Sequence, residues 1–576
     1  MGARSLLSFL RGKHRPLSLD LRRSAALPDG VAPGDGLRRR RTNSIQHLIL
    51  NDLIYLMWFI CGRDGHFRQT SSNTSRLFGI FALPFDLIAA RDNICGRRAG
   101  RFDRVRSRQT DRAQMPRPST TYLSAGPRLS ASAFDVCALI PIAAFAYSSL
   151  IQPLIYFNFP PTPGLQGLLE SRIENRIFWP ALAALAIIAA AQRLARGGRL
   201  SVPPNIVSLC AYFGFAGASV TWALKPELAF VRFAQEAMIL TAIVLPALLS
   251  NPTADIMRGM FVCFAIGVIL NVLLIPGGYA TYAQYGTQLV DIGYQGYFSG
   301  KNLLGEFAAT ALLLALHELR YPGYRRASGL VVALAAVTLI FISSSKTALG
   351  LALVAPALAL LVLLVARTFR LAPVLILTTM VLGYIVLSEL AGFGTNRIAY
   401  LLTGDSSFTG RTTIWAFSKL EIAQRPLLGW GYQSFWLVGA DAPSVTEAPG
   451  WVKGMPNSHN GFYDTMLELG YVGLALLLAF LAATVHVIGR VMKHDFKRAW
   501  ILLSIALFVM IYNFIETLWL RAFDVTWVAF VLVTVEAARY WSRSPLSTPI
   551  RRPMPTRAVH SVRTRLAWRP RLGVRF

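Results

Sequence analysis

Repeated apolar runs constrain this chain more than any other feature of its sequence. From Phe134 onward the runs are roughly 16 to 28 residues long, enough for a helix to cross about 30 Å of hydrocarbon. We identify about twelve, at residues 134–156, 177–193, 203–223, 233–249, 257–276, 303–319, 328–343, 347–366, 372–391, 460–487, 499–516 and 521–539. The chain is also 54% hydrophobic and only 15% charged, unlike most soluble domains. These features predict an all-α, polytopic bundle of transmembrane helices.

Lysine and arginine gather in alternate connectors between the runs. Short basic connectors of membrane proteins stay in the cytoplasm. The residues concerned are Arg193, Arg196, Arg199, Arg258, Arg320, Arg325, Arg326, Arg367, Arg370, Arg490, Lys493, Lys497 and Arg498. We therefore expect these connectors and both termini to be cytoplasmic. The same alternation places the long connectors 276–300 and 391–457, which follow the fifth and ninth runs, on the outer side.

The two ends of the chain differ from its middle. Both are rich in arginine and supply most of the net charge of +29. Residues 1–130 are predicted to be a basic, disordered extension, 134–540 the membrane domain, and 541–576 a basic, disordered cytoplasmic tail. An alternative is that translation starts at Met115, which leaves residues 1–114 outside the natural protein.

The basic ends also raise the question of nucleic acid. Arginine clusters such as 38–41 neutralise phosphates, but no DNA- or RNA-binding fold pattern accompanies them, and anionic lipid is the expected neighbour of a basic tail. The five cysteines form no CxxC pair and predict neither a disulfide framework nor a zinc site. We expect no nucleic-acid partner and no metal.

The outer connector 391–457 is the long segment of mixed polarity between runs, so external chemistry is expected to depend on it. Within it, residues 410–424 place Ile414, Phe417 and Leu420 at helical spacing. This spacing predicts a helix that lies along the membrane surface, or one that packs against the bundle.

Four motifs stand at the outer ends of the runs or in the outer connector. They are YFSGKNLLGEF at 297–307, SSSKTALG at 343–350, GRTTIW and RPLLGWGYQSFW within 410–436, and NSHNGFYDTMLELGYVGL at 457–474. Their order and spacing, over residues 290–487, resemble the O-antigen ligase and O-unit polymerase superfamily. The resemblance is strongest to exopolysaccharide polymerases of the succinoglycan type.

This resemblance implies a membrane glycosyltransferase of the bacterial inner membrane whose site faces the periplasm. The donor would be an undecaprenyl-diphosphate-linked oligosaccharide and the acceptor a sugar hydroxyl, with no cofactor and no metal. A flippase and a chain-length regulator of the same pathway are implied partners. The resemblance favours a polymerase of exopolysaccharide or O-antigen synthesis, and a ligase that moves glycan to lipid A-core is the alternative.

A transporter or flippase is the rival from another class of protein. Transporters concentrate polar positions at mid-membrane and often show two similar halves. Here the polar motifs gather at the outer face and no internal repeat is evident. The sequence therefore favours a transferase.

Glycan transfer needs a base near the acceptor hydroxyl and cations beside the departing diphosphate. His459 matches the family's HN motif and titrates near neutral pH, so it is the predicted base. Its alternative role is to cap the helix that begins near Asn460 or to face water. Arg411, in the GR motif, is predicted to bind diphosphate through its planar fork, or to snorkel at the interface.

Four further cations are predicted to bind the diphosphate. Lys301 and Lys346 stand at the outer ends of two runs, where each alternatively faces lipid headgroups. Lys346 departs from relatives that often place arginine there. Arg397 and Arg425 belong to the outer connector.

Several uncharged or acidic side chains are predicted to contact the glycan or support the site. Asn460, Asp464, Trp430 and Tyr432 are the glycan-binding candidates. Carboxylates at membrane depth, here Asp464, Glu306 and Glu468, are functional candidates by default, with helix packing as their alternative role. For the aromatic rings the alternative is an interfacial belt.

Overall fold

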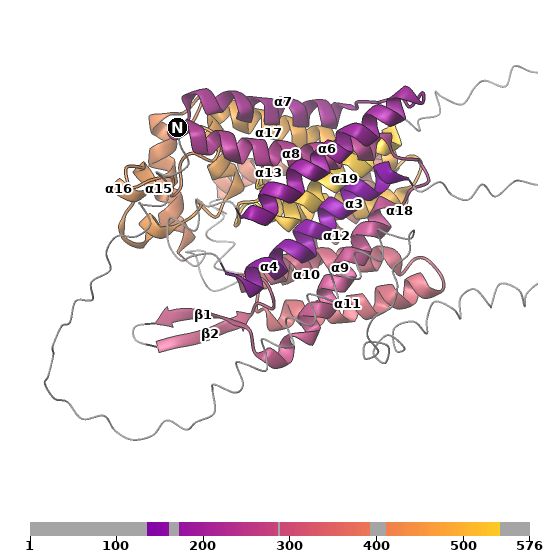
Figure 1. Ribbon diagram of the computed structural model, residues 1–576, viewed down its shortest axis with the longest axis horizontal. Coiled ribbons are helices and arrows are strands. Elements are labelled where there is room, and N and C mark those ends of the chain that lie inside the picture. Colours follow the sequence, from indigo (N-terminus) through magenta and orange to yellow (C-terminus); the bar gives the residue numbers. More distant parts are fainter. Residues whose placement is uncertain (1–134, 161–171, 286–287, 392–409, 542–576) are drawn as a thin grey trace, which may run out of the picture. The chain divides into compact units, whose positions relative to one another are not determined.

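The computed structural model describes residues 135–160, 172–285, 288–391 and 410–541, all within one unit of the chain (Figure 1). The helices of the first half are α3 (Val136–Ala146), the π-helical turn η1 (Tyr147–Ile151), α4 (Gln152–Asn158), α6 (Ile173–Ala195), α7 (Pro204–Ala218), η2 (Ser219–Trp222), α8 (Pro226–Leu249), α9 (Ile256–Leu273) and η3 (Ile275–Gly277). The extension 1–130, the tail from 542 and Arg397 lie outside the described residues.

The second half contains a hairpin and the remaining helices. These are β1 (Ala280–Tyr285), β2 (Gln288–Tyr294), α10 (Lys301–Glu318), α11 (Tyr324–Ile342), α12 (Lys346–Phe369), α13 (Pro373–Ala391), α15 (Arg411–Gln424), α16 (Pro443–Thr446), η4 (Gly450–Gly454), α17 (Gly461–Val491), α18 (Phe496–Tyr512) and α19 (Val525–Trp541). Every apolar run of the sequence is therefore helical, and an all-α membrane protein is the fold class.

Eight helical segments of the described chain are long and apolar enough to cross a membrane. They are Val136–Asn158, Ile173–Ala195, Pro226–Leu249, Ile256–Gly277, Tyr324–Ile342, Lys346–Phe369, Pro373–Leu390 and Gly461–Val491. The other predicted runs form α7, α10, α18 and α19, so the number of spans remains a prediction.

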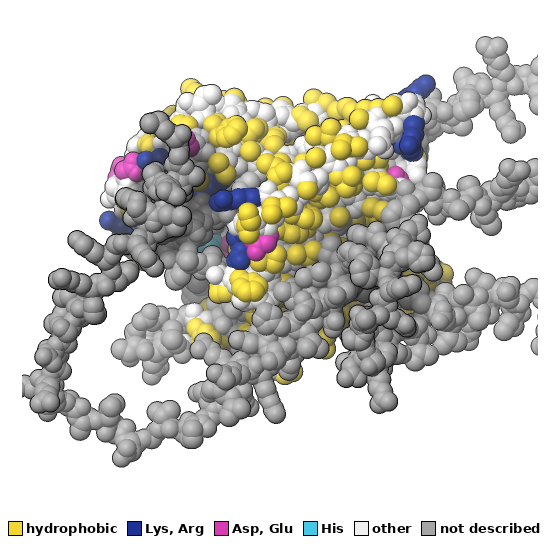
Figure 2. Space-filling model, viewed as in Figure 1, with side chains coloured by type: hydrophobic (Ala, Val, Ile, Leu, Met, Phe, Trp, Pro, Cys, Tyr) yellow, Lys and Arg dark blue, Asp and Glu magenta, His cyan; other side chains and the backbone are white. Residues whose placement is uncertain are grey.

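The core lies around α10, α18 and α19, because most side chains of these helices are buried. The helices around them, such as α6 and α8, turn apolar side chains outward, among them Ile187, Ile188 and Phe230. Figure 2 shows this apolar surface over the upper helices of the view. A face of this kind suits hydrocarbon rather than water.

The basic connectors meet at one end of the helices. Glu318, at the end of α10, pairs with Arg258 at 2.7 Å and with Arg325 at 2.6 Å. Glu536 of α19 similarly pairs with Arg498 at 2.9 Å and contacts Arg539. The hairpin, α15 and α16 lie at the other end (Figure 1). This arrangement agrees with the predicted alternation of connectors, while the side of the membrane that each end faces remains a prediction.

The hairpin β1–β2 is a feature that sequence reasoning did not predict. Its strands are antiparallel and pair Ala280 with Tyr294, with a bulge between Thr281 and Tyr282. Thr281 is bound to the start of α10, because its hydroxyl accepts from the backbone N–H of Lys301 at 2.9 Å. The hairpin therefore stands directly over the beginning of α10.

Helix α17 is interrupted at Gly470, whose φ of 64° is left-handed. A break frees backbone groups that must find other partners. The chain that follows α15 supplies them: the N–H groups of Trp430 and Gly431 donate to Leu467 and Glu468 at 2.7 and 2.9 Å, and the Pro426 carbonyl accepts from Tyr471 at 2.8 Å. The RPLLGWG motif is thus a backbone partner of α17.

Helix α15 packs inward rather than lying free on a surface. Its Ile414 and Phe417 are buried in a cluster with Trp430, Phe435, Trp436, Val452 and Leu467. Leu420, the third residue of the predicted apolar stripe, is 69% exposed. Of the two predicted placements for this helix, packing against the rest of the fold is the one observed.

Candidate active site

Three side chains from separate helix starts converge on Glu516, which lies in the loop between α18 and α19. Its Oε2 is 2.9 Å from Nδ1 of His459. Its Oε1 accepts from Arg411 Nη2 at 2.6 Å and from Asn302 Nδ2 at 3.1 Å. His459 precedes α17, Arg411 begins α15, and Asn302 is the second residue of α10. One carboxylate therefore joins the predicted base to the predicted phosphate ligand.

The loop before α17 holds His459 by several hydrogen bonds. Asn460 caps the helix, because its Oδ1 accepts from the N–H groups of Phe462 and Tyr463 at 3.0 and 3.1 Å. His459 itself has a left-handed φ of 51°, and its N–H donates to Oδ1 of Asn457 at 2.9 Å. The capping role belongs to Asn460, so the histidine ring is left to face Glu516.

Asp464, one turn into α17, is hydrogen-bonded to the same loop. It is 1% exposed and accepts from the Ser458 N–H at 3.1 Å, from Trp436 Nε1 at 2.8 Å and from the Thr517 hydroxyl at 2.6 Å. Arg521 lies 3.5 Å from Asp464 and donates to Glu468 at 2.8 Å. These contacts connect the start of α17 to the loop that carries Glu516.

The charge state of Glu516 sets the chemistry of its neighbours. Burial alone would raise its pKa, but the hydrogen bond with His459 and the charge of Arg411 outweigh burial, and the pKa lies below its usual value. An ionised carboxylate only accepts hydrogen bonds. It therefore favours the neutral tautomer of His459 with its proton on Nδ1, which leaves the Nε2 lone pair available.

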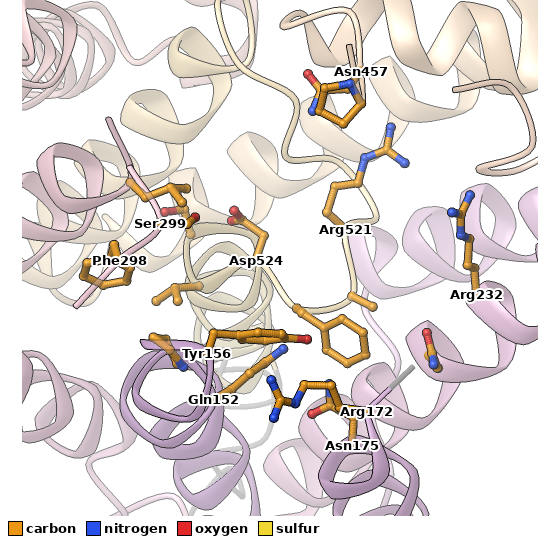
Figure 3. Close-up of a pocket in the computed structure, with 18 of the residues that line it drawn as sticks. Gln152, Tyr156, Arg172, Asn175, Arg232, Phe298, Ser299, Asn457, Arg521 and Asp524 are labelled. Atoms are coloured by element: carbon orange, nitrogen blue, oxygen red, sulfur yellow. The ribbon is translucent and has the colours of Figure 1, made fainter. Parts of the chain in front are cut away.

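A cavity of about 790 Å³ lies beside this network (Figure 3). Its walls come from α4, α6, α8, α10, α17 and the start of α19, and from the loops 295–299, 433–437, 456–457 and 521–524. Asn457, Trp436, Glu468 and Arg521 belong to both the cavity wall and the network around His459. The cavity therefore adjoins the network around His459.

Part of this chain is similar to a known protein family. The sequence model of the O-antigen ligase family matches residues 330–478. This segment is therefore similar to O-antigen ligases. It includes Arg411 and His459, and the predicted resemblance to the O-antigen ligase and polymerase family is confirmed.

A curated relative points the same way. The exopolysaccharide production protein ExoQ of Rhizobium meliloti (strain 1021) is 26% identical to this chain over 297 residues. The alignment covers 50% of this chain and 66% of the relative. Both comparisons therefore show similarity to the O-antigen ligase and polymerase family and to a protein of exopolysaccharide production.

The other cations predicted to bind the diphosphate have varied surroundings. Lys301 is half-buried, and its Nζ donates to the Ile292 carbonyl of β2 at 2.9 Å. Lys346 is exposed at the start of α12. Arg425 is exposed and stacks over Trp430 at 4.1 Å. Their diphosphate-binding roles remain predictions.

The predicted glycan-binding residues are largely engaged in internal contacts. Trp430 is buried in the cluster around α15 and donates to the Glu421 carbonyl at 3.2 Å. Tyr432 is fully buried and donates to the Leu520 carbonyl at 2.7 Å. Asn460 and Asp464 bind the loops described above. Direct glycan contact by these four residues would require their present neighbours to move, and it remains a prediction.

Sequence reasoning missed Glu516, Asn302, Thr517 and Arg521. The predicted helix 499–516 included Glu516, whereas α18 ends at Tyr512 and leaves this carboxylate in a loop. The rule that selected Glu306 and Glu468, a carboxylate at membrane depth, also applies to Glu516 and would have found it. Asn302 carried a weaker signal, its place beside Lys301 in the GKN motif.

Proposed function

We propose that this protein is a membrane glycosyltransferase that moves a glycan from undecaprenyl diphosphate to an acceptor sugar hydroxyl during polysaccharide synthesis. The observation that carries the proposal is the convergence of His459 and Arg411 on Glu516 within 3 Å. A histidine held by a buried carboxylate is a common arrangement for a general base. A permanently charged guanidinium beside it suits a departing diphosphate.

The step is a direct displacement. Nε2 of His459 takes the proton of the acceptor hydroxyl, and the acceptor oxygen forms a bond to the anomeric carbon. The bond from that carbon to the diphosphate oxygen breaks, and undecaprenyl diphosphate leaves with the electron pair. Because one displacement occurs at one face, the anomeric configuration inverts.

Cations lower the barrier by stabilising charge on the departing diphosphate. Arg411 is the principal one, and its Nε is buried without a hydrogen-bond partner among the described residues. Lys301 directly precedes Asn302 in the sequence, and we assign it a second positive charge for the diphosphate. Lys346 and Arg425 are more exposed and would act on a longer glycan or on headgroups. We further propose that no metal takes part.

Within this reaction class we favour a polymerase that joins lipid-linked repeat units. The similarity to a protein named for exopolysaccharide production supports this choice. A ligase that transfers glycan to lipid A-core is the second candidate, supported by the O-antigen ligase match. For either reaction we propose an inner-membrane location with the His459 end of the helices facing the periplasm.

The test is a size analysis of glycans from cells that lack this protein. The cells are complemented with wild type, with His459→Ala, or with His486→Ala, whose histidine is exposed further along the same helix. A polymerase predicts loss of long polymer and accumulation of single lipid-linked units with His459→Ala only. A ligase predicts long lipid-linked polymer that is absent from lipid A-core. Normal glycans with a correctly inserted His459→Ala protein would refute the assignment of the base.

A further inference from the structure

The cavity beside the site contains a buried polar atom without a partner. Gln152 is 4% exposed and lines the cavity, and its Oε1 has no hydrogen-bond partner in the described part of the chain. A buried amide oxygen usually has a donor. The π-helical turn η1 immediately precedes Gln152, and the Ser149 carbonyl of that turn accepts from Tyr297 at 3.1 Å. Gln152 thus offers an unpaired acceptor among the residues that line the cavity.

Arg232 of α8 lines the same cavity and differs from its cationic neighbours. Arg521 is neutralised by Glu468 at 2.8 Å, and Arg172 by Glu174 at 3.4 Å. Arg232 donates to the backbone carbonyl of Gln433, and no carboxylate of the described residues pairs with it. A half-buried guanidinium without a paired carboxylate is costly inside a membrane protein, so a site for an anion is expected there.

The charged and apolar residues of the cavity wall indicate how an anionic ligand would be oriented. Arg232 and Arg521 lie toward one side of it and Ser299 and Phe298 toward the other, while Arg172 lies beside Gln152 (Figure 3). Two apolar residues of α8, Leu228 and Val231, also line the cavity, and Val231 is 47% exposed on the apolar outer surface. A ligand with an anionic head and an apolar tail matches both features.

We propose that Arg232 and Gln152 form a binding subsite for a phosphate-linked sugar, with the phosphate on Arg232 and a sugar hydroxyl on Gln152. The subsite lies apart from Arg411 and His459, which do not line the cavity. The proposal rests on the proposed function, because a transferase of this class handles two substrates and needs more than one place for charged groups. The phosphate has two possible sources, a polyprenyl diphosphate or a phospholipid headgroup.

Binding of undecaprenyl diphosphate to the full chain in phosphatidylcholine nanodiscs tests the subsite. The background is the double variant His459→Ala, Arg411→Gln, so that neither turnover nor the first phosphate ligand contributes to the signal. Adding Arg232→Gln should weaken binding roughly tenfold or more, as expected for a lost hydrogen bond to a charged group. Arg196→Gln, an exposed arginine at the other end of α6, is the matched control and should change binding by less than about twofold.

Two further arms distinguish the outcomes. Phosphatidylglycerol added to the discs should compete only when a headgroup is the natural occupant, and competition that Arg232→Gln abolishes identifies that source. If Arg232→Gln does not fold, Arg232→Lys keeps the charge, loses the fork and should still weaken binding several-fold. Unchanged binding in either folded variant overturns the subsite. Because turnover is absent from this measurement, its result is independent of the glycan analysis that tests the proposed function.

Discussion

Glu516 Oε2 lies 2.9 Å from His459 Nδ1, across 57 residues of sequence. The other oxygen of the same carboxylate holds Arg411 at 2.6 Å. A single acidic residue therefore orients both groups that the proposed displacement requires. Because the pKa of Glu516 is below its usual value, this carboxylate stays charged well into the acid range.

Replacing Glu516 with glutamine should lower kcat by at least about a hundredfold, with a much smaller change in the KM for the lipid-linked donor. The amide can donate to Nδ1, which would place the imidazole proton on Nε2, where the base is needed. Turnover of purified lipid-linked repeat units across pH is the measurement. Glu447→Gln, on an exposed position of the outer connector, is the control. Equal kcat values for Glu516→Gln and wild type would contradict a positioning role.

The helices were predictable because hydrocarbon imposes a length and a composition that the sequence displays directly. The apolar runs all became helices for this reason. Likewise, the HN and GR motifs marked His459 and Arg411. Their common partner was not predictable from spacing, since Glu516, His459 and Arg411 come from separate elements and meet only when α15, α17 and the loop after α18 pack together.

Two other features depended on tertiary contacts. The hairpin β1–β2 is short, and its attachment through Thr281 to the start of α10 has no local signature. The inward packing of α15 depended on Trp430 and Phe435 arriving from the following chain to cover Ile414. Amphipathic spacing therefore predicted that helix but did not distinguish a lipid surface from a protein surface.

Thr517 should contribute to stability through two hydrogen bonds at the site. Its hydroxyl donates to Asp464 at 2.6 Å and accepts from the N–H of Asn460 at 3.1 Å. Thr517→Val removes both bonds and should cost about 1–3 kcal/mol, although Asp464 and the Asn460 N–H each keep a bond to Ser458. Thermal unfolding of the purified protein measures this as a lower melting temperature. Thr338→Val, on an exposed face of α11, should change stability by less than about 0.5 kcal/mol, and an equal loss in both variants would argue against a specific role.

Glu421 predicts a pH-dependent stability of α15. Burial, with a smaller effect from Glu447, raises its pKa to about 7. Between the ordinary value of 4.5 and 7 the folded state binds more protons than the unfolded state, so stability falls as pH rises through this window. Glu421→Gln should therefore raise the melting temperature at pH 8 and change it little at pH 5, where wild type is already protonated. A gain of equal size at both pH values would exclude this titration as the cause.

Gly470 should be intolerant of any side chain, because α17 breaks there to receive the chain after α15. Its φ is 64°, and an added Cβ would lie 2.2 Å from the carbonyl carbon and oxygen of Leu427. Gly470→Ala would force the two segments apart and disturb the hydrogen bonds that hold Trp430 and Gly431 against α17. We expect a loss of several kcal/mol, measured as a large drop in melting temperature and in folded yield. Gly350→Ala, in open space on helix α12, is the matched control and should be neutral or stabilising by up to about 1 kcal/mol. If both alanine variants behave alike, the break at Gly470 does not have the structural role inferred for it.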